Sequence, residues 1–279
     1  MNPQRTRILL AILLSIVWLT ADASSAILTK GINAKIMPVG DSITLGKDTK
    51  TGGYRSVLFD WLNATGYTII YVGNGDNGDP ANATSTSSEM TTPRSHEGYG
   101  SFRIDMILNG GTAERRTGPP IKTTIEKYKP DVVLLMIGTN DVIQNWELDK
   151  INDRLEKLIE TLFEADNQMT LVVASIPPIK RPAWADKENN VIAYNAAIPG
   201  IIAKQKALNR KISFVDVHAA LEKGGVLDAG GVHPNKTGYQ KIAAVWYQGL
   251  TGETAPPPPP VEKQTSRPLI TPTPATVRP

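Results

Sequence analysis

The sequence predicts a single α/β domain built on an open parallel sheet with helices on both faces. Short apolar runs alternate five times with helical patterns, which is typical of parallel sheets joined by right-handed crossovers. Two of the runs, "DVVLLMIG" (131–138) and "MTLVVASI" (169–176), are almost wholly apolar, as expected of central strands buried on both faces. Hydrophobic residues make up 41% of the 279 residues, enough to form a sizeable core.

The first half of the domain begins with a strand. "KIMPV" (35–39) is the first expected strand, and "GYRSVLFDWLNA" (53–64) places its apolar residues on one helical face. "YTIIYVG" (67–73) is rich in β-branched residues and predicts a second strand. Residues 74–100 are rich in Gly, Asn, Ser and Thr and predict a long loop, which in a compact domain is often functional.

The second half of the domain continues the alternation. The third strand is expected at 131–138, and the clearest helix follows at 148–162, where leucine and isoleucine recur at three- and four-residue spacing. Residues 169–176 predict the fourth strand.

The last elements are a helix, a strand and a closing helix. Residues 186–209 have a helical pattern, which Pro199 is expected to interrupt because proline lacks an N–H and clashes with the preceding turn. "ISFVDV" (212–217) predicts the fifth strand, and "TGYQKIAAVWYQ" (237–248) predicts the closing helix.

The N-terminal segment is expected to lie outside this domain. Arg5 and Arg7 precede the apolar run "ILLAILLSIVWLT" (8–20), and "ADAS" follows it, which is the order of a secretory signal peptide cleaved after Ala23. The run is short for a membrane span. We therefore expect residues 1–23 to be a signal peptide rather than an anchor, which leaves the mature protein secreted and off the membrane.

The C-terminal segment is separable as well. Residues 255–279 are rich in proline, with five prolines in a row, and predict an extended or disordered tail. Residues 24–254 remain as one domain. That domain has 25 basic and 25 acidic residues, although the whole chain has a net charge of +3. A neutral domain gives no electrostatic reason to expect nucleic acid as a partner.

Polar residues follow the expected strands. Ligands of open parallel sheets bind beyond the carboxyl ends of the strands, so these positions are the candidate site. "GDSIT" (40–44) follows the first strand and "GTND" (138–141) the third. Ser42 at the start of a turn or helix, with backbone N–H groups around it, suits a nucleophile. Asn140 offers an amide donor, as an oxyanion hole requires. Taken alone, each stretch is equally well interpreted as turn and cap residues, with Asp141 a possible helix cap.

His233 follows the fifth strand and a loop. The chain has three histidines and no cysteine, and no histidine pair has the spacing of a helical metal site, so we expect no metal. His218 closely follows Asp216 at a strand end, where a local hydrogen bond is the expected role. Because folding brings the strand ends together, Ser42, Asn140 and His233 supply the nucleophile, donor and base of acyl transfer.

These motifs resemble the SGNH (GDSL-type) hydrolases. "GDSIT", "GTND" and "GVHPNKTGY" match the serine, asparagine and histidine blocks of that superfamily. "HEGYGSFRID" (96–105), together with "IMPVGDSIT", "GGYR", "IGTNDV" and "YN", is similar to carbohydrate esterase family 3, which includes acetylxylan esterases. The resemblance covers about residues 35–248.

The resemblance implies a flavodoxin-like three-layer α/β/α sandwich with strand order 2-1-3-4-5. It implies Ser42 as nucleophile and His233 as base, with the Ser42 N–H and the Asn140 side chain stabilising the oxyanion. It implies no metal or organic cofactor. The sequence departs from the glycine block of the family, because the donor glycine falls at or beside Ser101. A backbone N–H of Ser101 or of Gly100 is expected there, and His96 is expected to fix the loop or contact substrate.

A second departure concerns the acid that orients the histidine. The acid of the family lies three residues before the histidine, where this chain has Gly230. Three interpretations stay open. Asp228 reaches His233 through a bulged loop, a backbone carbonyl or water orients the ring and leaves a Ser–His dyad, or catalysis is weakened or lost.

The predicted function is that of a secreted serine esterase, monomeric, that removes acetyl or other short acyl groups from plant cell-wall polysaccharide. The alternatives are a lipid-ester or thioester hydrolase on the same fold and a catalytically decayed carbohydrate-binding protein. Trp146, Trp184 and Tyr99 are candidate sugar-stacking surfaces. The sequons at Asn63 and Asn82 are expected to carry glycans, whereas Asn235, in a third sequon, is as well suited to capping the last helix.

Overall fold

The computed structural model describes residues 26–47, 49, 52–75, 95–114 and 116–257. The expected signal peptide and most of the proline-rich tail lie outside these residues, so both stay predictions. In the part of the chain that is described, no helix is long and apolar enough to cross a membrane.

The central sheet has the expected strand order. Within the described residues it contains six parallel strands in the order β2-β1-β6-β7-β8, with the short β3 paired to β1. β3 continues the edge formed by β2, because β2 pairs with the first half of β1 and β3 with its last two residues. The order confirms the predicted 2-1-3-4-5 topology. The strands of this sheet are β1 (Asn33–Gly40), β2 (Thr68–Tyr71), β3 (Glu97–Gly98), β6 (Val132–Met136), β7 (Thr170–Ala174) and β8 (Ile212–Val215).

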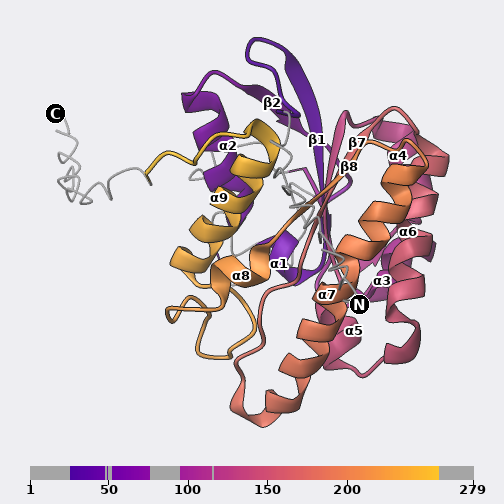
Figure 1. Cartoon of the computed structure of the whole chain (residues 1–279), viewed down its shortest axis with the longest axis vertical. Coiled ribbons are helices and arrows are strands. Elements are labelled where there is room, and N and C mark those ends of the chain that lie inside the picture. The colour runs from indigo at the N-terminus through magenta and orange to yellow at the C-terminus, as the bar shows by residue number, and fades with distance from the viewer. Residues whose placement is uncertain (1–25, 48, 50–51, 76–94, 115, 258–279) are drawn as a thin grey trace, which may run out of the picture.

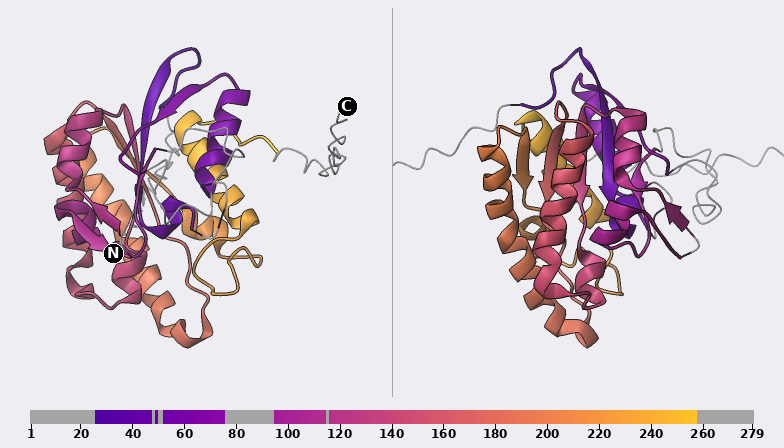
Figure 2. Two further views of the ribbon diagram at one scale, coloured as in Figure 1. Left: turned by 180° about the vertical axis from the view of Figure 1, so that it is seen from behind. Right: turned by 90° about the vertical axis from the view of Figure 1, so that its right-hand side faces the viewer.

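Helices cover both faces of this sheet and make three layers (Figure 1). One face is covered by α1 (Ser42–Leu45), α2 (Tyr54–Ala64), α8 (Val217–Leu221) and α9 (Lys236–Thr251). The other face is covered by α3 (Ile104–Asn109), α4 (Ile121–Tyr128), α5 (Thr139–Ile143), α6 (Ile151–Ala165) and α7 (Ala185–Ala207). The views in Figure 2 show the same sandwich from behind and from the side.

Alternation along the strands supplies both cores. Met37 and Val39 of β1 face the core under α3, α4, α6 and α7, whereas Ile36 faces the core under α2 and α9. Val132–Met136 are all buried, which explains why this strand is apolar throughout.

Pro199 does not interrupt α7, which runs unbroken from Ala185 to Ala207. The expectation of a break was wrong for a physical reason. Pro199 is on the exposed face of the helix, while Ile198, Ile201 and Ile202 pack into the core. Burial of the opposite face outweighs the loss of one hydrogen bond.

Several elements were not predicted. Residues 95–130 hold β3, α3, α4 and an antiparallel hairpin of β4 (Gly111–Ala113) and β5 (Arg116–Gly118). Two 3-10 turns, at Leu148–Lys150 and Pro182–Trp184, were also not predicted. These pieces are too short for hydrophobic periodicity to show.

Candidate active site

The serine lies at the start of a short helix. Ser42 is the first residue of α1, and Asp41 caps that helix by accepting a hydrogen bond from the Ile43 N–H at 2.9 Å. The Ser42 N–H has no intrahelical partner at this position and points out of the helix N-terminus. Gly40 precedes the turn, where a Cβ would lie 2.2 Å from the Met136 carbonyl oxygen. Only glycine therefore allows β1 to turn into α1 this close to β6.

Arg55 fixes the other end of α1, a role that the sequence did not indicate. Its buried guanidinium donates to the carbonyls of Thr44 at 2.9 Å and Leu45 at 3.1 Å. These are the carbonyls that a helix C-terminus leaves unpaired. Burial lowers the pKa of Arg55 from its ordinary value. Arg55 of the "GGYR" motif thus holds α1, the helix that carries Ser42, in place.

His233 lies beside the serine. Its Nε2 is 2.9 Å from Ser42 Oγ, within hydrogen-bonding distance, although the two residues are 191 positions apart. The loop that carries His233 is closed by backbone hydrogen bonds from Asp228 N to the His233 carbonyl at 2.7 Å and from Asn235 N to the Val226 carbonyl at 2.9 Å. The two side chains therefore have the geometry of a nucleophile and its base.

Asp228 approaches the other nitrogen of the ring. Asp228 Oδ2 is 3.8 Å from His233 Nδ1, which is ion-pair range but longer than a hydrogen bond. A Cβ added at Gly230 would lie 3.2 Å and 3.3 Å from the two carboxylate oxygens of Asp228. The carboxylate of Asp228 thus occupies the space into which a side chain at position 230 would extend. Asp228 is held in this position by two hydrogen bonds. Its carbonyl accepts from the Gly231 N–H, and its Oδ1 accepts from the Val232 N–H.

Asn140 projects from the start of α5. Its Nδ2 donates to the Phe102 carbonyl at 2.9 Å, which leaves the second amide hydrogen for a substrate. The residue is 9% exposed. Asp141 does not cap α5, as had been considered: the capping position is Gly138, and Asp141 accepts from Ile104 N at 3.0 Å and pairs with Arg154 at 3.0 Å.

The loop of the expected glycine block runs past α1, which carries Ser42, and α5, which carries Asn140. Tyr99 N donates to the Gly40 carbonyl at 3.1 Å, and a Cβ at Gly98 would lie 2.6 Å from Leu45 N. Ser101 has φ 60°, the left-handed conformation that glycine normally takes. In the described structure the N–H groups of Gly100 and Ser101 have no protein partner. The chain thus brings four potential donors, from Ser42, Gly100, Ser101 and Asn140, to one edge of the sheet.

Two buried aspartates next to the site have perturbed pKa values. Burial raises the pKa of Asp41 to about 6. Burial likewise raises the pKa of Asp141 to about 6, against the opposing effect of Arg154. The acid that caps α1 therefore retains its proton to a higher pH than an exposed aspartate does.

The three candidate aromatic surfaces differ. Tyr99 is wrong as a sugar platform, because it is buried and stacks on Phe102 at 4.7 Å between ring centroids. Trp146 is 40% exposed, and the guanidinium of Arg103 covers one face of its ring at 4.0 Å. Trp184 is half-buried under Arg181 at 4.2 Å.

The other histidines have structural partners. His96 is buried, and its Nδ1 accepts from Gly98 N at 2.9 Å, so it fixes the loop. Burial and then Arg55 hold the pKa of His96 well below its ordinary value. The expected bond between His218 and Asp216 was wrong, because the His218 ring pairs with Glu188 at 2.9 Å. No group of three metal-ligating side chains occurs among the residues whose structure is described.

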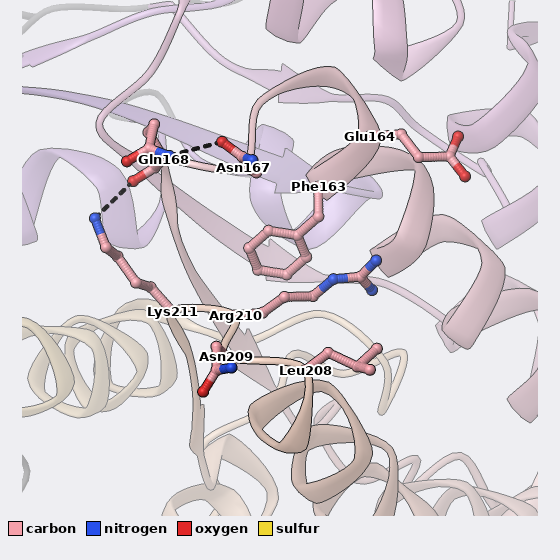
Figure 3. A pocket seen from close by; sticks show the side chains of 8 residues that line it. All are labelled: Phe163, Glu164, Asn167, Gln168, Leu208, Asn209, Arg210 and Lys211. Atoms are coloured by element: carbon pink, nitrogen blue, oxygen red, sulfur yellow. Dashed lines mark hydrogen bonds between the residues drawn. The ribbon is translucent and has the colours of Figure 1, made fainter.

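A separate hollow lies at the other end of the sheet. It opens beside the residues that precede β7 and β8, whereas Ser42 and Asn140 follow their strands. It is therefore not part of the candidate site. Figure 3 shows its lining residues, Phe163, Glu164, Asn167, Gln168, Leu208, Asn209, Arg210 and Lys211.

The three sequons have different positions. Asn63 is exposed on α2 and donates to the Phe59 carbonyl at 3.0 Å, and its glycosylation stays a prediction. Asn82 lies outside the described residues. Asn235 caps α9, since its side chain accepts from Gly238 N at 3.0 Å, and its amide donates to the carbonyls of Gly225 and Leu227.

Fold and site together define a class of protein. A parallel α/β/α sheet that gathers a serine, a histidine and amide donors at the carboxyl ends of its strands is the arrangement of the SGNH-type ester hydrolases. The chain belongs to the GDSL-like lipase/acylhydrolase family, whose pattern residues 39–241 match. The predicted membership of this superfamily and of the carboxylic ester hydrolases is therefore confirmed at the level of the family.

Relatives of known sequence include two esterases. The chain is 34% identical over 227 residues to the multidomain esterase of Ruminococcus flavefaciens, a match that covers 78% of this chain. It is 28% identical over 140 residues to the acetylxylan esterase of Xylanibacter ruminicola, which covers 42% of this chain. In each case the match spans only 28% of the length of the relative.

Solved structures agree. The family 3 carbohydrate esterase of Clostridium thermocellum is similar with a TM-score of 0.60 and 30% identity, over 78% of this chain and 94% of the other. A family 3 carbohydrate esterase from Talaromyces cellulolyticus has a TM-score of 0.61 and 25% identity, over 78% and 96% of the two chains. Both match the predicted resemblance to that esterase family.

Proposed function

We propose that the chain is a secreted esterase that removes acetyl or other short acyl groups from plant cell-wall polysaccharide through a Ser42 acyl-enzyme. The observation that carries the proposal is the 2.9 Å contact between Ser42 Oγ and His233 Nε2, next to backbone N–H groups without a protein partner. Such a contact is what activates a serine hydroxyl.

The first half of the reaction acylates the serine. Ser42 Oγ attacks the ester carbonyl carbon while its proton passes to His233 Nε2, and the carbonyl oxygen becomes an oxyanion. As the tetrahedral intermediate collapses, the bond to the sugar oxygen breaks, and His233 returns the proton to that oxygen. The sugar leaves as an alcohol, and the acyl group remains on Ser42.

The second half regenerates the enzyme. Water gives a proton to His233 and attacks the acyl carbon, and Ser42 leaves with that proton. The oxyanion of both steps is stabilised by the N–H of Ser42, the N–H groups of Gly100 and Ser101, and the second amide hydrogen of Asn140. Donors that are fixed before the reaction need no reorganisation as charge develops.

Asp228 is the proposed orienting acid. Its carboxylate fills the space in front of position 230 and lies in ion-pair range of Nδ1. At 3.8 Å it stabilises the imidazolium by charge rather than by a direct hydrogen bond. Of the three interpretations that the sequence left open, this geometry favours the first, with a weaker contact than a hydrogen-bonded triad.

The choice of a polysaccharide rests on relatives and on the rim. Relatives of this chain include an acetylxylan esterase and carbohydrate esterases of family 3. The exposed ring of Trp146 follows α5, the helix that carries Asn140, and offers a sugar-stacking surface. The export signal expected at 1–23 would bring the enzyme to such substrates outside the cell.

The direct test compares wild type with Ser42→Ala on 4-nitrophenyl acetate. We expect the variant to lose at least 10³-fold in kcat, as is typical when the nucleophile of such a site is removed. Equal activity of the two proteins would refute the mechanism. The matched control is Ser56→Ala, which removes a hydroxyl from α2 rather than from α1.

Two outcomes would favour the alternatives. Activity that rises from acetyl to decanoyl esters would favour a lipid-ester or thioester hydrolase. A protein in which a fluorophosphonate fails to label Ser42 would instead be a decayed carbohydrate-binding protein.

A further inference from the structure

Ser101 holds a backbone conformation that is unfavourable for its residue type. Its φ of 60° lies in the left-handed region, which costs a residue with a Cβ about 1–2 kcal/mol and glycine almost nothing. The residue belongs to the segment whose N–H groups are the proposed oxyanion donors. Something in the fold must therefore compensate for the absence of glycine.

A carboxylate anchors the side chain of Ser101. The Ser101 hydroxyl donates to Glu114 Oε1 at 2.5 Å, and the same carboxylate accepts from Lys47 Nζ at 3.3 Å. The hydrogen bond from Ser101 and the nearby Lys47 lower the pKa of Glu114. The carboxylate is therefore ionised at neutral pH and is a strong acceptor.

The anchor itself is seated against the same loop. Glu114 follows β4 at the turn toward β5, with φ 47°. A Cβ at Gly100 would lie 2.6 Å from Glu114 Oε2, so the carboxylate packs directly on the backbone next to Ser101. Lys47 connects this group to the nucleophile, because Lys47 N donates to the Ser42 carbonyl at 2.9 Å.

We infer that Glu114 is a positioning residue for ester hydrolysis: its hydrogen bond to the Ser101 hydroxyl holds Ser101 in the left-handed conformation that presents the N–H groups of Gly100 and Ser101 to the oxyanion. This inference rests on the proposed function. The ion pair with Lys47 is a lesser contribution, since both side chains are about 40% exposed and solvent screens exposed pairs.

The inference predicts a specific pattern of kinetic effects. Glu114→Ala removes the anchor but leaves the Cβ of Ser101, which disfavours a positive φ. The Ser101 backbone therefore spends part of the time outside the left-handed conformation. We expect kcat on 4-nitrophenyl acetate to fall about tenfold with KM unchanged, because the oxyanion donors act in the transition state. Ser101→Ala removes the same hydrogen bond and is expected to give the same loss.

Glycine provides the decisive comparison. Ser101→Gly adopts a positive φ without strain, so it no longer needs the anchor. In the Ser101→Gly background, Glu114→Ala is expected to change kcat less than twofold. A protein in which Glu114 merely stabilised the hairpin would show the same loss in both backgrounds.

A matched control separates positioning from damage to the hairpin. Thr112→Ala breaks the 2.9 Å contact between Thr112 and Thr117 in the same hairpin without touching Ser101, and we expect kcat within twofold of wild type. A tenfold loss from this control, or an equal loss from Glu114→Ala in both backgrounds, would overturn the inference.

The failure of this inference can be told apart from failure of the proposed function. If the wild type is active and Glu114→Ala lowers kcat equally in the wild-type and Ser101→Gly backgrounds, the positioning role is refuted and the proposed esterase activity stands. An inactive wild type would refute the esterase. The wild type, Glu114→Ala, Ser101→Gly and the double variant would then be compared by Tm. Glu114→Ala must lower Tm less in the Ser101→Gly background, and equal shifts would refute the anchor.

Discussion

The pairing of Asp228 with His233 makes a quantitative prediction. Asp228→Asn removes the negative charge but keeps the size of the side chain, and its amide oxygen can still accept from Val232 N, as the carboxylate oxygen does at 3.2 Å. The variant therefore tests the charge and leaves the loop in place. We expect a loss of activity well short of that of a hydrogen-bonded triad acid.

The magnitude follows from the distance. Two unit charges 3.8 Å apart attract by about 1 kcal/mol in water and about 4 kcal/mol at an effective dielectric constant of 20. The Asp228 side chain is 31% exposed and that of His233 is 17% exposed, so the pair lies between these limits. A value of about 2 kcal/mol corresponds to about a 30-fold loss of kcat, at about 1.4 kcal/mol per factor of ten.

The assay is the steady-state kcat on 4-nitrophenyl acetate at fixed ionic strength, with Glu222→Gln as a control that removes an exposed carboxylate nearby in the sequence. A loss below threefold would mean that Asp228 does not stabilise the imidazolium. A loss near 10⁴-fold, as when a hydrogen-bonded triad acid is neutralised, would mean that the working enzyme closes the 3.8 Å gap. Either result would refute the reasoning from distance.

A second substitution tests the space in front of position 230. The φ of Gly230 is not in the left-handed region, and a Cβ there would point at the carboxylate of Asp228. Gly230→Asp in the Asp228→Ala background, which empties that space, is therefore expected to recover at least tenfold in kcat. No recovery would show that the two carboxylates do not share one position.

The remaining predictions concern the cap of α1 and the rim. The pKa of Asp41, about 6 against an ordinary 3.8, means that the folded state retains the proton more strongly, so the contribution of this group to stability is fully present below about pH 4 and is lost as pH rises through 6. Asp41→Asn keeps the cap and is expected to raise the free energy of unfolding at pH 8, by at most about 3 kcal/mol, with no gain at pH 4. Urea unfolding at both pH values checks this, and an equal gain at both would contradict it. Trp146→Ala is expected to lower kcat/KM on acetylated xylo-oligosaccharide about fivefold, from the loss of about 1 kcal/mol of stacking, with 4-nitrophenyl acetate unaffected. Ile70→Ala, an exposed apolar residue on β2, is the control, and parallel losses on both substrates would count against a sugar subsite.

Much of the site was predictable because the fold was. Parallel strands deliver their carboxyl ends to one edge of the sheet, so the residues that follow β1 and β6 had to meet there. Ser42 and Asn140 needed only correct strand assignments. The position of His233 needed, in addition, the loop between α8 and α9, where the resemblance to known esterases rather than periodicity marked the residue.

Side chains held by distant loops were not predictable in this way. Glu114 is 13 residues from Ser101 and 67 from Lys47, and no local pattern links the three. Arg55 was visible only as part of a motif, and its role depends on the end of α1 lying against α2. Pro199 was misjudged because local propensity says nothing of which helix face is buried.

The sequence by itself determined the alternation of strands and helices, the edge at which the polar residues gather and the absence of thiol chemistry in a chain without cysteine, whereas the strand order came from the resemblance to a known family. These follow from hydrophobic patterning and connectivity, which act along the chain. Only the tertiary structure decided that the Asp228 carboxylate occupies the place in front of Gly230, and that Ser101 takes a left-handed conformation with a carboxylate to hold it. The physical reason is that loop conformations are fixed by contacts between segments far apart in sequence, which no single segment encodes.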